Sequence, residues 1–175
     1  MKTLITIAIA ALCATSVALA APESTASKIA RALSAGPPSV TSGAAVIWID
    51  DNGKATPLRK GTNGWTCGVG MKGVVGMDPF CADGSAMQWF ASYLGHKPKP
   101  AITTPGVVYM LQGGTDWSAT DPWATKGTPI KEPPHWMIMY PYGSASGLSS
   151  ANKQSGTWIM YAGTPYAHLM ILQKP

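Results

Sequence analysis

Two histidines begin similar apolar segments towards the end of the chain: His-Trp-Met-Ile-Met from residue 135 and His-Leu-Met-Ile-Leu from residue 168. Side chains alternate between the two faces of a β-strand, so His135 shares a face with Met137 and Met139. By the same rule, His168 shares a face with Met170. Imidazole and thioether groups together suit copper, above all Cu(I). If the strands pair in register, the pattern predicts a copper site. In the alternative interpretation, methionine fills core space and each histidine bonds a backbone carbonyl.

The same two histidines are candidates for acid–base chemistry, because imidazole gains and loses a proton near neutral pH. Asp116 or Asp121, from the preceding loop, would orient a ring in a hydrolytic His-Asp pair. The Gly-x-Ser-x-Gly motif of many hydrolases is absent, since Ala145 stands at the nucleophile position of the nearest match. The chain also lacks the Walker, dinucleotide-binding and His-Glu-x-x-His motifs. Hydrolysis is therefore an alternative hypothesis, and the sequence leaves open whether the protein is an enzyme.

A third kind of chemistry is the stacking of a flat ligand on indole rings. Trp117 and Trp123 lie in the long loop 112–134, which is rich in glycine and proline. If exposed, they would form a platform for a sugar or another flat molecule, with Asp116 and Asp121 beside them; if buried, they would only anchor the loop. The aspartates lack the spacing of a calcium loop, which favours turns. Noncatalytic binding of a small molecule or glycan is the function that we favour.

Strands that would position these residues are predicted where β-branched and aromatic residues cluster, at 45–49, 107–111, 136–140 and 157–172, the last divided into a hairpin by Gly-Thr-Pro at 163–165. Asn52-Gly53 after the first strand predicts a tight turn, and a second Asn-Gly at 63–64 suggests a meander. Pro57 cannot donate to a strand ladder, which argues against a central strand between these turns.

One principal helix is predicted for residues 83–95. Asp83 is a favourable N-cap, and Met87, Phe90 and Leu94 follow at helical spacing. Gly95 is expected to end the helix in the left-handed conformation. The helix and the strands together predict an α+β fold: a mostly antiparallel β-sheet with one principal helix, one disulfide and long loops rich in Gly, Pro and Trp.

Residues 1–20 have the pattern of a secretory signal peptide. Lys2 precedes an apolar run over 4–12, and Ala-Leu-Ala at 18–20 predicts cleavage before Ala21. We therefore expect an exported protein, in the periplasm or outside the cell. No later apolar run is long enough to span a membrane, so we expect no membrane insertion after cleavage.

After cleavage, we expect a flexible arm over residues 21–43 and a single globular domain over 44–175. The chain has 13 basic and 8 acidic residues, and its net charge of +5 falls by one when Lys2 is removed. The basic residues are scattered and form no stripe along a helix. Nucleic acid is therefore not an expected partner.

The predicted export determines which cysteines can form a disulfide. Cys13 is removed with the signal peptide, which leaves Cys67 and Cys81. In an oxidising compartment this pair predicts one disulfide, which closes a loop of about 15 residues. The spacing matches neither a Cys-x-x-Cys redox motif nor a zinc ribbon.

The chain carries five further motifs: Asn-Gly-Trp-Thr-Cys at 63–67, Asp-Pro-Phe-Cys at 78–81, Tyr-Met-Leu-Gln-Gly-Gly-Thr-Asp at 109–116, Asp-Pro-Trp-Ala-Thr at 121–125 and Gly-Thr-Pro-Tyr-Ala-His at 163–168. Together they resemble the motifs of a family of uncharacterised exported bacterial proteins, from Leu58 to the C-terminus. The resemblance implies an exported bacterial protein. It implies no catalytic residues, because the family has no established activity.

Overall fold

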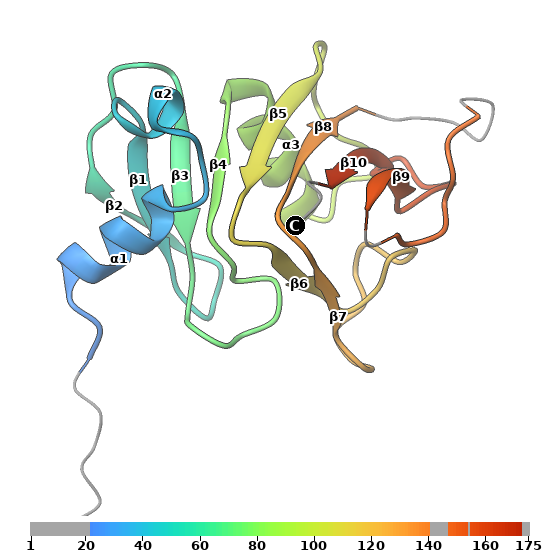
Figure 1. Ribbon diagram of the computed structural model, residues 1–175, viewed down its shortest axis with the longest axis horizontal. Coiled ribbons are helices and arrows are strands. Elements are labelled where there is room, and N and C mark those ends of the chain that lie inside the picture. Colours follow the sequence, from blue (N-terminus) through green and yellow to red (C-terminus); the bar gives the residue numbers. More distant parts are fainter. Residues whose placement is uncertain (1–21, 141–146, 154, 173–175) are drawn as a thin grey trace, which may run out of the picture.

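Ten strands and three helices form within residues 22–140, 147–153 and 155–172, the part of the chain that the computed structural model describes (Figure 1). In chain order they are α1 (Thr25–Leu33), α2 (Pro38–Thr41), β1 (Ala45–Ile49), β2 (Ala55–Arg59), β3 (Thr66–Val69), β4 (Phe80–Ala82), α3 (Gly84–Leu94), β5 (Gly106–Met110), β6 (Gly114–Asp116), β7 (Ile130–Glu132), β8 (His135–Met139), β9 (Gly156–Met160) and β10 (His168–Leu172).

Eight of these strands form one sheet in the order β2-β1-β3-β4-β5-β8-β10-β9, and β6 and β7 form a separate hairpin. Neighbouring strands in the large sheet are antiparallel, except for β1 and β3, which run parallel. The predicted α+β fold with a mostly antiparallel sheet is therefore confirmed. The predicted strands correspond to β1, β5, β8 and the β9–β10 hairpin.

The first three strands do not form the expected meander, because β1 lies between β2 and β3. Residues 60–65 carry the chain back past β1, where the Ala45 N–H donates to the Trp65 carbonyl at 2.8 Å. Gly61 permits this return, since a Cβ there would overlap the Ala45 nitrogen. Pro57 lies in β2 at the edge of the sheet, where proline is tolerated.

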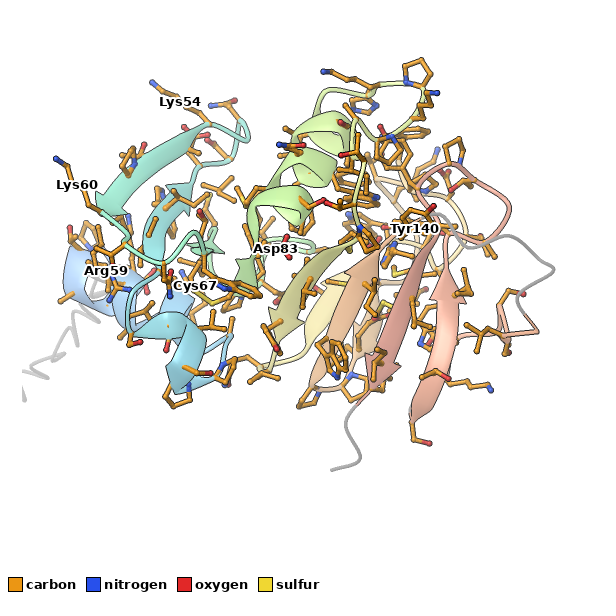
Figure 2. All side chains as sticks on the ribbon, turned by 90° about the horizontal axis from the view of Figure 1, so that it is seen from above. Lys54, Arg59, Lys60, Cys67, Asp83 and Tyr140 are labelled. Atoms are coloured by element: carbon orange, nitrogen blue, oxygen red, sulfur yellow. A yellow bond between two sulfur atoms is a disulfide. The ribbon has the colours of Figure 1, made fainter. Side chains whose placement is uncertain are left out.

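Helix α3 begins at the predicted N-cap. The Asp83 carboxylate accepts hydrogen bonds from the Ala86 N–H at 2.8 Å and from the Val107 N–H at 2.9 Å, so one side chain caps the helix and ties it to β5. Figure 2 shows Asp83 at this junction. The expected left-handed Gly95 is wrong: its φ is −81°, and the chain reverses one residue later, at His96, with a φ of 47°.

The expected disulfide joins Cys67 of β3 to the directly opposite Cys81 of β4, with an S–S distance of 2.07 Å. Helix α1 covers this pair. Ala32 and Ala35 are fully buried, and the Ala32 carbonyl oxygen lies 3.8 Å from the Cys81 Sγ. The segment 21–43, expected to be a flexible arm, therefore carries a helix packed on the sheet. The small alanine side chains explain the difference, because they allow the helix to approach the disulfide closely.

The two longer helices lie on opposite faces of the sheet (Figure 1). α1 packs on the face that carries the disulfide, and α3 packs on the other face against β4 and β5. The core beneath α3 extends to β8, β9 and β10 and is rich in methionine and aromatic residues: Trp89, Met137, Met139, Trp158, Met160, Tyr161, Tyr166 and Met170. None of the helices in the described ranges has the length and apolar character needed to cross a membrane.

Candidate ligand-binding cavity

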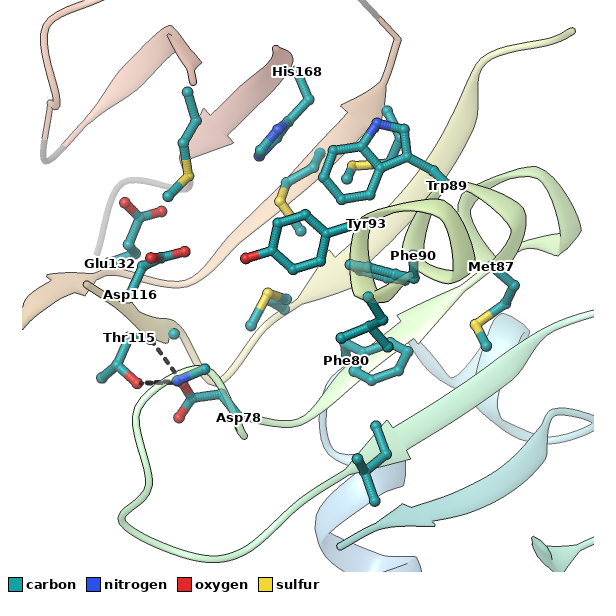
Figure 3. Close-up of a pocket in the computed structure, with 18 of the residues that line it drawn as sticks. Asp78, Phe80, Met87, Trp89, Phe90, Tyr93, Thr115, Asp116, Glu132 and His168 are labelled. Carbon is teal, nitrogen blue, oxygen red and sulfur yellow. Dashed lines mark hydrogen bonds between the residues drawn. The ribbon is translucent and has the colours of Figure 1, made fainter. Parts of the chain in front are cut away.

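A cavity of about 310 Å³ lies between α3 and the sheet (Figure 3). Its walls are mostly apolar, and they include six of the chain's nine methionines: Met87, Met110, Met137, Met139, Met160 and Met170. Aromatic rings of Phe80, Trp89, Phe90 and Tyr93 complete the wall on the side of α3. Volumes of about 300–1,000 Å³ with mostly apolar walls are typical of small-molecule sites, and methionine adapts to different ligand shapes.

The cavity opens to solvent on one side. Among its lining residues, those that are exposed lie on the β1–β2 hairpin, the loop between β3 and β4 and the second half of α3: Gly53, Ala55, Gly76, Ala91 and Leu94. The methionines of β8 and β10 are buried at the opposite, inner side. A ligand would therefore enter between the hairpin and α3.

Three acidic side chains lie together at one end of the cavity: Asp78 before β4, Asp116 on β6 and Glu132 on β7 (Figure 3). Asp78 accepts hydrogen bonds from the Thr115 N–H at 2.7 Å and the Thr115 hydroxyl at 2.6 Å. Asp116 accepts one from the Tyr161 hydroxyl at 2.5 Å. The β6–β7 hairpin thus places two carboxyl groups, from diagonal positions of its register, at the cavity wall.

Glu132 is the least satisfied of these acids. It is 8% exposed, and its Oε1 has no hydrogen-bond partner. The other oxygen, Oε2, lies 4.0 Å from the Nε2 of His135, which is too far for a hydrogen bond. A buried polar atom without a partner costs about 1–3 kcal/mol. This atom therefore marks a place where a bound group can donate a hydrogen bond.

Burial controls the protonation of this end of the cavity. Burial, and to a lesser extent the charge of Asp116, raise the pKa of Glu132 from 4.5 to about 7. Burial also raises the pKa of Asp116, against the hydrogen bond from Tyr161, which lowers it. No lysine or arginine is present among the described residues that line the cavity. Its negative charge is therefore not compensated by any fixed positive charge.

Both predicted histidines line this same cavity, as do Met137, Met139 and Met170. The structure does not place the two rings opposite each other, however. In the register of β8 and β10, His135 lies opposite Leu172. The same register places His168 opposite Met139, which is four residues further along β8 than His135. Within the described residues, no group of three His, Cys, Asp or Glu side chains could hold a metal ion. A copper site here would therefore depend on the methionines.

Each histidine bonds a backbone carbonyl at the start of its strand, as the alternative interpretation predicts. The Nδ1 of His135 lies 2.7 Å from the Pro133 oxygen, and that of His168 lies 3.0 Å from the Tyr166 oxygen. A carbonyl only accepts, so Nδ1 carries the hydrogen and Nε2 is the free nitrogen of the neutral ring. Burial lowers the pKa of both rings, that of His168 to about 4.

The predicted aspartate partners of the histidines lie elsewhere. Asp116 bonds Tyr161 rather than a histidine, and Asp121 is exposed and accepts from the Trp123 N–H at 3.0 Å. The acid nearest His135 is Glu132, which the sequence reasoning missed. The signal that could have found it is the spacing of Glu132 and His135, three residues apart and separated only by two prolines.

The two tryptophans of the predicted platform do not line the cavity. Trp117 is half-buried, whereas Trp123 is 37% exposed. The Trp123 ring packs against Tyr166 and His96, with centroid distances of 5.2 and 5.5 Å. Binding of a glycan by these two rings stays a prediction from the sequence, and of its four residues the structure places only Asp116 at the cavity.

Comparisons with models of known families, with curated proteins and with solved structures give no match. The resemblance to a family of exported bacterial proteins therefore stays a prediction from the motifs. The fold and the cavity define an α+β protein with a methionine-lined cavity that is acidic at one end, and the function must be inferred from that cavity.

Proposed function

We propose that this protein binds a small, largely apolar ligand in the cavity beneath α3, outside the cytoplasm and without catalysing a reaction. The observation that carries the proposal is the cavity itself: about 310 Å³, mostly apolar walls, an opening to solvent and a few buried polar groups at one end. This combination is the usual form of a small-molecule site.

The magnitude of the hydrophobic contribution supports binding of a compact ligand. A molecule that buries about 200 Å² of apolar surface gains about 5 kcal/mol at 25 cal/mol per Å². Part of this gain is lost to immobilisation of the ligand. We therefore expect affinities in the micromolar to millimolar range for simple probes that use the apolar wall alone.

The state of the polar groups favours binding over catalysis. Burial keeps the ring of His168 neutral at physiological pH, and both histidines are held by backbone carbonyls. No hydrogen bond joins a histidine to an aspartate in the described part of the chain. The described residues therefore lack the His-Asp hydrogen bond that the hydrolytic alternative requires.

Export is part of the same proposal. The segment that we interpret as a signal peptide lies outside the described residues, and the disulfide is the supporting observation, because such bonds persist in oxidising compartments. The pattern of residues 1–20 predicts the same compartment.

A fluorescent probe tests the binding proposal. N-phenyl-1-naphthylamine is uncharged and becomes fluorescent in apolar surroundings, so its titration reports binding directly. Ala91→Trp places a large ring at the opening from an exposed helical position, and Gln88→Trp is the matched control on the same helix outside the cavity lining. We expect the wild type and Gln88→Trp to bind the probe equally, and Ala91→Trp to bind it at least tenfold more weakly. Equal binding by all three proteins, or by none, would contradict the proposal.

A second candidate function is Cu(I) binding, favoured by the gathering of six methionines and two histidines around one cavity. Met137→Leu with Met170→Leu removes two opposed thioethers while conserving volume. Anaerobic Cu(I) titration against bicinchoninate should show competition by the wild type and a loss of competition by the double variant. If the wild type does not compete, the copper hypothesis is wrong.

A further inference from the structure

The cavity is lined by acidic groups, whereas the chain as a whole has a net charge of +5. Three of the chain's eight acidic residues line it, and none of its 13 basic residues is among the described lining. Lys54 is the basic residue nearest in sequence to the opening, between Gly53 and Ala55, and Figure 2 shows its side chain pointing away from α3. A positively charged ligand group would meet carboxylates and no fixed positive charge.

The geometry of the acidic end indicates where such a group would lie. Glu132 is more than nine-tenths buried, and its unpartnered Oε1 can accept a hydrogen bond. Asp116 lies beside it, close enough for its charge to act on Glu132, and Figure 3 shows both carboxyl groups on the same side of the cavity. An ammonium group has three donors and can bond both carboxylates at once.

The rest of the lining suits a ligand that carries an ammonium group on an apolar body. The aromatic rings of Tyr93, Trp89 and Phe90 belong to α3 and line the cavity. The faces of aromatic rings attract cations, and the methionines beyond them contact apolar groups. A phenyl or short alkyl body attached to the ammonium group matches this division.

We infer that the natural ligand is a small amphipathic amine, whose ammonium group donates to Glu132 and Asp116 while its apolar body contacts the methionine wall. The inference rests on the proposed function and deepens it by assigning the chemical class of the ligand. It also gives the free Oε1 of Glu132 a hydrogen-bond donor.

The titratable groups around the acidic end determine the pH dependence of amine binding. They are Asp78, Tyr93 on α3, Asp116 on β6, Glu132 on β7, His135 on β8, Tyr161 after β9 and His168 on β10. Glu132 ionises at about pH 7, so it is a carboxylate at pH 8 and mostly a neutral acid at pH 5.5. The amine should therefore bind at least tenfold more weakly at pH 5.5 than at pH 8, whereas the uncharged naphthylamine probe should not change.

Three matched competitors test the inference by displacement of N-phenyl-1-naphthylamine at pH 8. They are 2-phenylethylamine, the uncharged 2-phenylethanol and the anionic 3-phenylpropanoate. We expect the amine to bind at least tenfold more tightly than the alcohol, and the carboxylate to bind most weakly. In Glu132→Gln, the amine should lose most of its advantage over the alcohol, because only Asp116 remains to accept from the ammonium group. Glu23→Gln, which changes the chain's other glutamate on the opposite face of the sheet, should behave like the wild type.

The outcomes separate this inference from the proposed function. If the probe and the alcohol bind but the amine binds no more tightly, the amine inference is wrong and the apolar site stands. If the carboxylate binds most tightly, Glu132 acts as a neutral donor and the inference is also wrong. If neither the probe nor any competitor binds, the proposed function itself is wrong. The pH dependence of the wild type provides the same test without any substitution, should Glu132→Gln fail to fold.

Discussion

Replacement of Glu132 by glutamine tests the buried acidic end through stability alone. Glutamine occupies nearly the same volume but cannot ionise. In the folded protein the pKa of Glu132 is raised to about 7 from an ordinary value of 4.5. At about 1.4 kcal/mol per pH unit, ionising this carboxyl in the fold costs about 3 kcal/mol more than in the unfolded chain. The side chain is only 4% exposed, so screening by solvent does not reduce this figure much.

The sign follows from the direction of the shift. The folded state favours the protonated carboxyl, so its contribution to stability is fully present below pH 4.5 and is lost as the pH rises through 7. The wild type loses this contribution to stability as the pH rises, and Glu132→Gln does not. The free energy of unfolding of the variant, relative to the wild type, should therefore increase by about 3 kcal/mol between pH 4.5 and pH 8.

Urea unfolding followed by tryptophan fluorescence at several pH values, with the disulfide intact, measures this difference. Glu23→Gln is the informative control, because the hydrogen bond from Arg31 lowers the pKa of Glu23. The pH dependence of the stability difference between this variant and the wild type should therefore have the opposite sign. That variant should lose stability relative to the wild type above pH 4.5. A difference between Glu132→Gln and the wild type that stays constant from pH 4.5 to pH 8 would show that Glu132 ionises as if exposed, contrary to this prediction.

Three further predictions concern the stability of the fold. The pKa of His168 is lowered to about 4, so the neutral ring stabilises the fold above pH 6.5. This contribution, about 3 kcal/mol, is lost as the pH falls through 4. His168→Gln should therefore lose less unfolding free energy than the wild type when the pH is lowered. Reduction of the disulfide, which closes a loop of about 15 residues, should lower the urea-unfolding free energy by about 3 kcal/mol. Gly106→Ala should destabilise the protein by about 2 kcal/mol or more, because a Cβ there overlaps the backbone of Ala86 in α3. Gly84→Ala, where a Cβ meets no atom within 4 Å, should leave the melting temperature unchanged or higher.

Local patterns predicted much of the fold. The capping residue Asp83 and the helical spacing of Met87, Phe90 and Leu94 located α3 correctly. Alternating segments located β8 and β10, and the predicted pair of cysteines forms the disulfide. The helix and the strands depend on residues close in sequence. The disulfide was predicted because Cys67 and Cys81 are the two cysteines left after the predicted removal of Cys13. Both kinds of information are present in a single sequence.

Features that depend on packing between distant segments were not predictable in the same way. The parallel pairing of β1 and β3 depends on a return of the chain past Gly61, which no local pattern indicates. Helix α1 has few large apolar residues, and it packs in a cluster that includes both cysteines, which are distant in sequence.

The candidate site was predicted only in part. The two histidines and three of the methionines line one cavity, but Glu132 has the local sequence of an exposed residue, between Lys131 and Pro133. It is buried because β7, paired with β6, places it in the wall of the cavity beside Asp116. Tyr161 was missed for the same reason, since its hydroxyl meets Asp116 across 45 residues of chain.

The proposed function requires that a small, largely apolar ligand enters the cavity beneath α3. The most direct test is NMR of ¹³C-methyl-labelled methionine during titration with N-phenyl-1-naphthylamine. We expect shifts of the lining methyl groups, those of Met137, Met139 and Met170 among them, and an unchanged signal from Met71, which is 40% exposed and lies outside the lining. Unchanged signals from the lining methionines, with or without a shift of Met71, would contradict the proposed function.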